Sequence, residues 1–155
     1  MSRGVPIREI ALTALMAALI FVLTAVPRIP VPATGGYIHL GDTGVTFAAS
    51  AFGPWVGMIA GGLGTALADL MGFPQWAIFS LVVHGMQGFA VGWILKREIT
   101  WVTSVLATLV GAVIVVGGYF VAGAILVGPA VAVVEILPNA IQGISGGLLG
   151  LPLFI

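Results

Sequence analysis

Residues 100–127 read TWVTSVLATLVGAVIVVGGYFVAGAILV, a run without one charged side chain. A helix of about 20 apolar residues crosses a hydrocarbon core of about 30 Å, so this run predicts a membrane-spanning helix. The rest of the chain has the same character, since 60% of its 155 residues are hydrophobic and 6% are charged. A soluble domain carries about 25% charged residues. We therefore expect lipid to surround most of the protein.

Prolines, glycines and polar residues divide the chain into six hydrophobic stretches, each predicted to be helical. Their bounds are 7–26, 42–52, 55–71, 75–95, 100–127 and 133–155, with a long loop at 27–41. The pattern predicts an all-α bundle of six transmembrane helices in a single membrane domain, residues 1–155. The stretch 42–52 is too short to cross a bilayer untilted. The first stretch lacks a small-x-small cleavage site, so we expect a retained helix and not a signal peptide.

The basic residues predict the orientation of the chain. If successive helices alternate in direction, both termini, the turn at 53–54 and the loop at 96–98 lie on one side of the membrane. That side holds Arg3, Arg8, Lys96 and Arg97, and the other side holds only Arg28. Cytoplasmic loops carry an excess of Lys and Arg. We therefore expect both termini in the cytoplasm and the loop 27–41 outside.

Composition also excludes several classes of function. Five Lys and Arg against five Asp and Glu leave no basic footprint for nucleic acid, and the absence of cysteine excludes disulfides and thiolate metal sites. The two histidines lack the spacing of a metal motif. No phosphate-binding loop and no Ser/His/Asp arrangement is evident. We expect no catalytic residue, no metal and no cofactor, so transport or binding is favoured over catalysis.

Three acidic residues lie in or beside hydrophobic stretches, where ionisable side chains are costly and are functional candidates by default. Asp42 follows a glycine and opens a predicted helix, so N-capping explains it well. Asp69 lies near the carboxyl end of a helix, where the helix dipole opposes a carboxylate. A partner or a ligand is therefore the better explanation for Asp69. Glu135 lies near the start of the last helix, where the dipole favours it.

Two stripes of polar side chains predict a small-molecule pocket near the outer membrane face. One stripe comprises Glu135, Asn139 and Gln142 (i, i+4, i+7), and the other comprises Trp76, Ser80, His84 and Gln87 (i, i+4, i+8, i+11). Apolar walls with a few convergent polar groups are typical of such pockets. For His84 the alternative is an interhelical hydrogen bond. Trp76 and Tyr37 could stack on a flat ring or belong to an interfacial aromatic belt.

Three runs of residues carry a resemblance to a known family. The runs GYIHLGD at 36–42, FGP at 52–54 and GGLGTALADL at 61–70 look like the substrate-binding S components of energy-coupling factor (ECF) vitamin transporters. Within these they look most like the branch for hydroxymethylpyrimidine, pyridoxine and related small vitamins. The resemblance covers nearly the whole chain. It departs at His84 and Gln87, where many relatives carry a basic residue and an acid, which leaves the ligand open.

The resemblance implies capture of a small water-soluble vitamin or precursor at the outer face of a prokaryotic plasma membrane, for ATP-driven import. It implies that Ala14 and Ala18 contact a transmembrane coupling protein, which two ATPase subunits drive, and that the loop 27–41 is a lid. The expected substrate-binding residues are Tyr37, His39, Asp69, Trp76, Ser80, His84, Gln87, Glu135, Asn139 and Gln142. The expected ligand is a heteroaromatic such as pyridoxine or hydroxymethylpyrimidine.

Two other classes stay open at the level of sequence. One is a solitary membrane carrier without ATPases, and the other is a membrane assembly subunit without a ligand. Ala14 and Ala18 could equally serve tight internal packing, because two small residues one turn apart let any helix approach closely. The sequence does not say which way that face of the first helix points.

Overall fold

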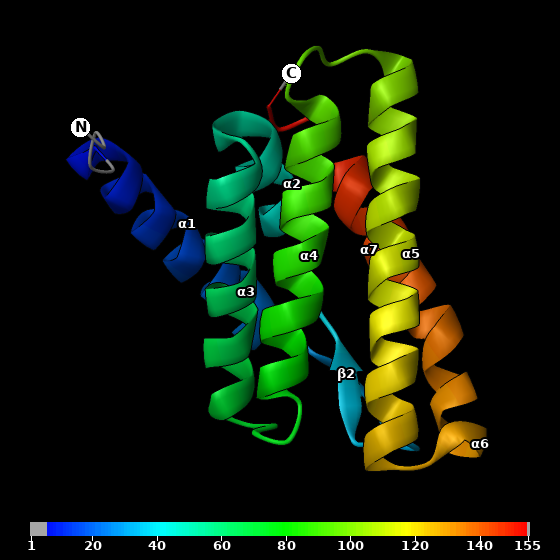
Figure 1. Ribbon diagram of the computed structural model, residues 1–155. Coiled ribbons are helices and arrows are strands. Elements are labelled where there is room, and N and C mark those ends of the chain that lie inside the picture. The colour runs from blue at the N-terminus through cyan, green and yellow to red at the C-terminus, as the bar shows by residue number, and fades with distance from the viewer. Residues whose placement is uncertain (1–5, 155) are drawn as a thin grey trace.

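The computed structural model describes residues 6–154, so Arg3 lies outside the described residues. Figure 1 shows a bundle of helices with one small β-hairpin. The helices are α1 (Ile7–Ala25), α2 (Gly41–Phe52), α3 (Pro54–Leu70), α4 (Ala77–Leu95), α5 (Trp101–Leu126), α6 (Pro129–Ala132) and α7 (Ile136–Gly150), and the 3₁₀ turn η1 (Val133–Glu135) joins α6 to α7. All six predicted hydrophobic stretches are therefore largely helical.

Within residues 6–154, four helical segments are long and apolar enough to cross a membrane. They are Ile7–Ala25, Ala77–Leu95, Trp101–Leu126 and the combined segment Pro129–Gly150. Helix α3 has 17 residues and α2 has 12. The last predicted helix, 133–155, begins earlier than expected because Gly128 and Pro129 start a new turn. Its first part is the short α6 and η1, and α7 ends at Gly150.

The predicted loop 27–41 is partly a β-hairpin, which corrects the purely α-helical expectation. Strand β1 (Ile29–Val31) pairs antiparallel with β2 (Gly36–Ile38), and Pro30 lies opposite Tyr37. Gly35, in the turn, has a φ of +66°, a conformation that glycine adopts without steric cost. Short strands such as these leave no hydrophobic period for sequence analysis to detect.

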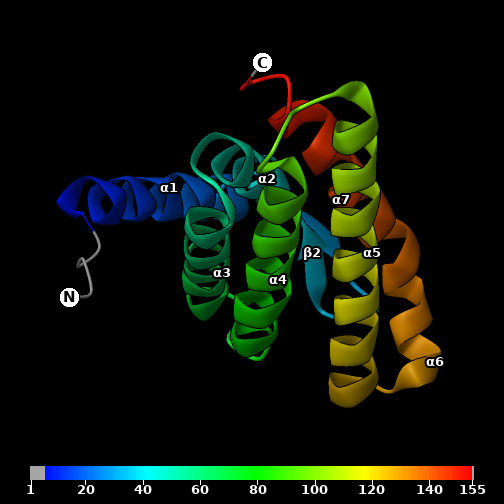
Figure 2. The same ribbon diagram turned by 45° about the horizontal axis from the view of Figure 1, so that its top comes forward.

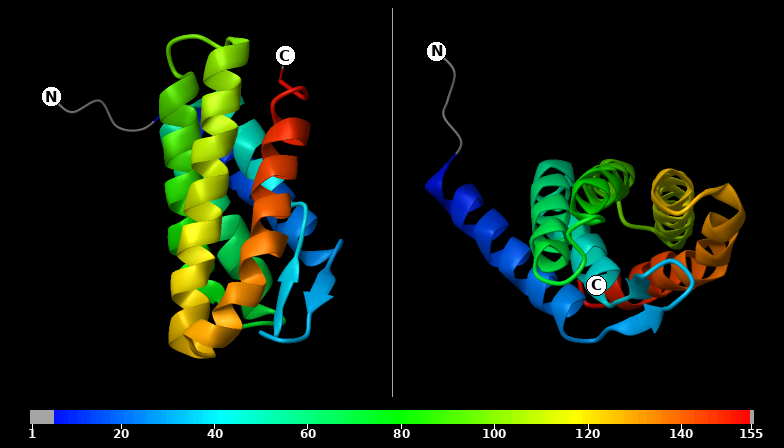
Figure 3. Two further views of the ribbon diagram at one scale, coloured as in Figure 1. Left: turned by 90° about the vertical axis from the view of Figure 1, so that its right-hand side faces the viewer. Right: turned by 90° about the horizontal axis from the view of Figure 1, so that it is seen from below.

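The connections gather at two ends of the bundle. In Figure 1 the hairpin, the α3–α4 turn and the α5–α6 turn lie at the lower end, which we call the hairpin end. The α2–α3 turn, the α4–α5 connection and the C-terminal segment lie at the upper end. Helix α1 crosses this bundle obliquely, and its amino-terminal half extends away from the other helices (Figures 2 and 3).

Helices α3 and α4 pack backbone against backbone. A Cβ atom on Gly57 would lie 2.8 Å from the carbonyl oxygen of Gly88, so only glycine allows this approach. On the outside, large apolar side chains remain uncovered, as in Val113, which is 70% exposed on α5. This distribution suits a protein whose outer surface is in contact with lipid.

Candidate substrate-binding site

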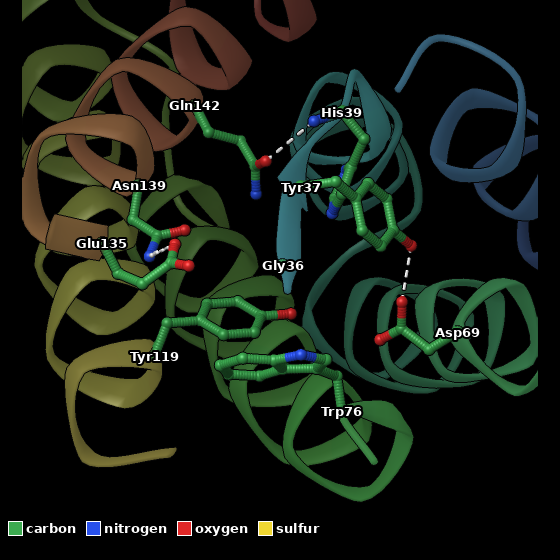
Figure 4. Close-up of a pocket in the computed structure, with 9 residues that line it drawn as sticks. All are labelled: Gly36, Tyr37, His39, Asp69, Trp76, Tyr119, Glu135, Asn139 and Gln142. Atoms are coloured by element: carbon green, nitrogen blue, oxygen red, sulfur yellow. Dashed lines mark hydrogen bonds between the residues drawn. The ribbon is translucent and has the colours of Figure 1, made fainter. Parts of the chain in front are cut away.

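A pocket at the hairpin end collects residues from the hairpin and the residue after it, from the α3–α4 turn, from η1 and from helices α3, α5 and α7 (Figure 4). Its walls are formed by Gly36, Tyr37, His39, Asp69, Trp76, Tyr119, Glu135, Asn139 and Gln142. The cavity volume is about 20 Å³. A water molecule needs at least about 10–15 Å³ of such space, so the pocket in this state is closed around no more than one or two waters. Any larger ligand requires the wall to move.

One of the two predicted polar stripes lines this pocket completely, and the other lines it only in part. The residues predicted on the last helix, Glu135, Asn139 and Gln142, all line it, as do Tyr37, His39, Asp69 and Trp76. Ser80, His84 and Gln87 do not line it. These three side chains lie behind the wall, each no more than 1% exposed. Tyr119 and Gly36 also line the pocket, although the sequence did not predict them as binding residues. Neither one belongs to a stripe of polar side chains within its own segment.

Tyr37 and Asp69 join the hairpin to α3. The Tyr37 hydroxyl donates to Asp69 Oδ1 at 2.5 Å, and the Ser80 hydroxyl donates to Asp69 Oδ2. Burial raises the pKa of Tyr37 well above its ordinary value, and the negative charge of Asp69 raises it further. Tyr37 therefore stays protonated and remains a donor. Since Asp69 receives two O–H donors, its carboxylate is stabilised despite its position at a helix carboxyl end.

Tyr119 continues this network from the pocket into the bundle. Its hydroxyl lies 2.5 Å from Ser80 Oγ and 3.1 Å from His84 Nε2. On the far side of the ring, His84 Nδ1 lies 2.9 Å from Gln87 Oε1 and 3.2 Å from Asp42 Oδ1. Ser80 and His84 therefore hold the Tyr119 hydroxyl, and Gln87 supports His84 from behind.

Asp42 is the centre of the buried polar network, and the N-cap prediction for it is wrong. It is the second residue of α2 and makes no capping hydrogen bond; the N-cap position is Leu40. The carboxylate instead accepts from Gln87 Nε2 at 3.2 Å and from Gln142 Nε2 at 3.3 Å. It turns into the bundle because donors from α4 and α7 converge there, and it is 1% exposed.

His39 is a neutral imidazole at the floor of the pocket. Its Nδ1 accepts a hydrogen bond from the backbone N–H of Gly41 at 3.0 Å, so the ring proton is on Nε2. Burial lowers the pKa of His39 well below its ordinary value, with further lowering from His84 and Arg28. The backbone N–H of His39 donates to Gln142 Oε1 at 2.9 Å, which ties the end of the hairpin to α7.

His39, Asp42 and His84 form a cluster that the spacing of the histidines did not suggest. One ligand-type atom from each lies within 4.8 Å of the others. However, a metal ion bound at His39 Nε2 would leave the remaining ring proton on Nδ1, facing the Gly41 N–H. The donor set therefore fits a hydrogen-bonded network better than a metal site.

Glu135 connects the hairpin to the last helix. It accepts from the Thr34 hydroxyl through Oε1 and from Asn139 Nδ2 through Oε2, the latter at 3.3 Å. Gly36 lies against it, since a Cβ atom on Gly36 would be 2.9 Å from Glu135 Oε1. The hairpin is thus fastened to α7 by Glu135 and to α3 by Asp69.

Arg28 supports the Tyr37 ring from outside the pocket. Its guanidinium carbon lies 4.7 Å from the centre of the Tyr37 ring and 5.3 Å from that of Phe73. Its Nη2 donates to the carbonyl oxygen of Ala68 at 3.0 Å. Such a cation over two aromatic rings holds the base of the hairpin against the end of α3.

The second predicted site, on α1, faces outward. Ala14 and Ala18 are both exposed, whereas Met16 and Ile20 on the opposite face are buried in the core. Ala14 also borders an apolar groove between α1 and α3, together with Ala17 and Ile59. The small residues are therefore not used for packing within the chain.

Comparison with known proteins identifies the family. The family model for the S component of ECF-type riboflavin transporters matches residues 5–155. The chain belongs to the S components of ECF-type transporters. This membership confirms the predicted resemblance to S components and the predicted location in the membrane, as a multi-pass protein. It also confirms the prediction of a transport protein and not an enzyme.

Relatives and solved structures agree with the assignment of this S component. It is 35% identical over 145 residues to the thiamine precursor transporter HmpT of Lactococcus lactis subsp. cremoris (strain MG1363), covering 92% of this chain and 83% of the relative. It is 42% identical over 129 residues to an uncharacterized protein of Pyrococcus woesei, covering 83% of this chain and 87% of that protein.

Two solved structures share the fold. An S component for biotin matches with a TM-score of 0.69 at 18% identity, covering 99% of this chain and 94% of that one. The S component of a bacterial ECF transporter matches with a TM-score of 0.72 at 20% identity, covering 95% and 93%. At these identities the likeness concerns the fold alone.

Proposed function

We propose that this S component captures a single-ring heteroaromatic vitamin precursor, such as hydroxymethylpyrimidine or pyridoxine, in the pocket at the hairpin end. The observation that carries the proposal is the set of side chains around this pocket: acids, amides and aromatic rings converge on one small cavity. A ring nitrogen or hydroxyl of the ligand finds donors and acceptors among them, and Trp76 and Tyr119 supply flat apolar surface.

The comparisons support a small ligand. The relative named for a thiamine precursor is 35% identical across 92% of this chain, whereas the similarity to the S component for biotin is 18%. The family model is named for riboflavin, which has three fused rings. A pocket that closes to about 20 Å³ must open least for a single ring, which favours hydroxymethylpyrimidine or pyridoxine over riboflavin.

We propose that the hairpin, within the loop 27–41, is the lid of this pocket. Its attachments to the bundle near the pocket are side-chain hydrogen bonds, from Tyr37 to Asp69 and from Thr34 to Glu135. Each of these bonds has a carboxylate acceptor and is worth about 1.5–3 kcal/mol, and water or ligand can take its place, whereas a shift of α4 or α5 would disturb helix packing. The hairpin is therefore the wall that is easiest to move.

We further propose one membrane domain, residues 1–155, with six spans and both termini in the cytoplasm. The turn at 53–54, the connection at 96–100 and the C-terminal segment share one end of the bundle. Lys96 and Arg97 lie at that end, and Arg28 lies near the hairpin. The positive-inside rule then assigns the hairpin end to the outer face.

Import is proposed to be driven by an ECF module, consisting of a transmembrane coupling protein and two ATPase subunits. The exposed pair Ala14 and Ala18 supports α1 as the docking surface. Two methyl-sized side chains one turn apart let a helix of the coupling protein approach closely.

Ligand identification tests the proposal. The protein is purified gently, and the ligand that it releases is analysed by mass spectrometry, followed by calorimetric titration with hydroxymethylpyrimidine, pyridoxine and riboflavin. We expect one of the first two to be released and to bind most tightly. Release or tight binding of riboflavin would overturn the proposed ligand class. Retention of no small molecule would favour an assembly subunit instead.

A further inference from the structure

Trp76 has an indole N–H without an acceptor. The side chain is 4% exposed, and its Nε1 has no hydrogen-bond partner among the residues that the structure describes. Buried polar groups in proteins are nearly always hydrogen-bonded, and a buried donor left without a partner carries the full cost of its lost hydration. An exception in the wall of a binding pocket calls for an explanation.

The packing of Trp76 turns this N–H toward the other residues that line the pocket. The six-membered edge of the indole points to α5, since a Cβ atom on Gly123 would lie 3.9 Å from Trp76 Cη2. The ring lies beside Tyr119, with centroids 5.9 Å apart and planes inclined by 50°. Figure 4 shows the nitrogen on the ring edge that faces the other pocket residues. The orientation is therefore set by packing and not by a bond to the nitrogen.

Several other polar groups of the pocket already have partners. Asp69 receives Tyr37 and Ser80, and Glu135 receives Thr34 and Asn139. Both ends of the Gln142 amide are used as well. The two acids and the Gln142 amide are thus occupied, and the indole N–H of Trp76 is a fully buried donor of the pocket wall for which residues 6–154 offer no acceptor.

We propose that Trp76 recognises the substrate by donating a hydrogen bond from Nε1 to an acceptor atom on it, such as a ring nitrogen or a hydroxyl oxygen. The inference rests on the proposed function and adds a specific role to a residue expected only to stack. A site that donates to a substrate atom discriminates strongly against analogues without that atom, because the donor is then left unpaired. Trp76 would therefore select against rings that present C–H at this position.

The test replaces the N–H without changing the shape of the side chain. Residue 76 of the full-length protein is changed from Trp to β-(3-benzothienyl)alanine, in which sulfur stands in place of the N–H group. Affinity is measured by calorimetry with hydroxymethylpyrimidine and pyridoxine. It is also measured with analogues of each in which one ring nitrogen is replaced by C–H or one hydroxyl group by hydrogen. The same replacement at Trp93, which is 57% exposed and stacks on Phe89, is the control.

We expect the replacement at residue 76 to weaken binding about 5- to 150-fold, the range for one hydrogen bond to a buried group. The thermal stability of the ligand-free protein should be equal or higher, because an unpaired donor is removed. The analogue that lacks the acceptor atom should bind the unmodified protein more weakly than its parent ligand does. The replacement at residue 76 should not weaken the binding of that analogue any further. The control at Trp93 should leave affinity unchanged.

Two results would overturn the inference while the proposed function stands. The first is that the replacement leaves the affinity unchanged. The second is that it weakens the parent ligand and every analogue equally and also lowers the stability of the protein. The second result would mean that Trp76 is only a packing residue. If the unmodified protein binds neither hydroxymethylpyrimidine nor pyridoxine, the proposed function fails first, and the inference fails with it.

Discussion

The Tyr37 hydroxyl, on the second strand of the hairpin, donates to Asp69 Oδ1 on α3 at 2.5 Å and so links two residues that line the pocket. The two residues are separated by 32 positions in the chain. The carboxylate belongs to a long helix of the bundle, and the tyrosine belongs to the β-hairpin. With the hairpin as the proposed lid, we expect this bond to break when the pocket opens.

Tyr37→Phe should open the pocket without unfolding the protein. The ring still stacks beside Phe73, at 4.5 Å between centroids, but the hydrogen bond to a charged group, worth about 1.5–3 kcal/mol, is lost. We expect ligand dissociation to be about 10-fold faster or more, and hydrogen exchange at residues 29–38 to no longer slow fully when ligand is added.

A double-mutant cycle with Asp69→Asn checks the Tyr37 prediction. If the two residues act through their mutual bond, the double variant should be little worse than either single variant. Additive effects on dissociation would show that Tyr37 does not work through Asp69.

Asp42→Asn distinguishes a network centre from a helix cap. Asparagine caps helices as well as aspartate does, so a capping role predicts little change in stability. In the structure the carboxylate accepts from two amide N–H groups and contacts His84, and the Asn side chain would place an NH₂ group against one of these donors. We expect a loss of about 1–3 kcal/mol in unfolding free energy, measured by thermal or denaturant unfolding. Glu98→Gln, at an exposed residue, is the matched control and should be neutral.

Asn139→Ala and His84→Ala should differ, because only Asn139 lines the pocket. Asn139→Ala should weaken ligand binding by roughly 1–3 kcal/mol, with a small change in stability. His84→Ala removes a side chain that is fully buried and hydrogen-bonded behind the wall, so it should lower stability first. Calorimetry and thermal unfolding of both variants separate the two effects. Equal losses of affinity at equal stability would place His84 in direct contact with the ligand.

The double change Ala14→Leu and Ala18→Leu should block assembly with the coupling protein and leave ligand affinity as it is. Both side chains point away from the core, so larger ones fit the isolated protein but keep a partner helix at a distance. Val113→Leu adds bulk at another exposed position and serves as control. Co-purification of the complex and ligand titration are the two measurements. A complex that forms normally with the double variant would mean that docking uses another face.

Acid should destabilise the closed hairpin through His39. Its pKa in the folded protein is lowered by burial, then by His84 and Arg28, whereas an unfolded histidine titrates near about 6.5. Between these two values the unfolded chain binds a proton that the folded one does not. Stability therefore falls as pH drops below about 6.5.

The matched variant for this pH dependence is His39→Asn, whose side-chain oxygen can still accept from the Gly41 N–H. Thermal unfolding is measured from neutral to mildly acidic pH in both proteins. The slope below about 6.5 should be flatter in the variant. The difference in slope between the two proteins isolates the contribution of residue 39. Identical slopes would rule out His39 as the source.

Much of this protein follows from local sequence. Long runs without charge dictate helices in lipid, because only a helix satisfies its own backbone there. The spacing of Glu135, Asn139 and Gln142 places them on one helix face, and they do lie together in the pocket wall. The acid Asp69, at an unfavourable helix end, was correctly judged to need a partner, and Tyr37 and Ser80 are its partners.

Only the tertiary structure decided which polar side chains reach the cavity and which support it. A helical period says that Trp76, Ser80 and His84 share a face but not what covers that face. Tyr119 from α5 contacts Ser80 and His84 and itself lines the pocket, which they do not. Asp42 has the local sequence of a cap, yet donors from α4 and α7, 45 and 100 residues away, bind its carboxylate instead. Local spacing fixes direction within one helix, whereas burial and hydrogen-bond partners depend on neighbours that are distant in the chain.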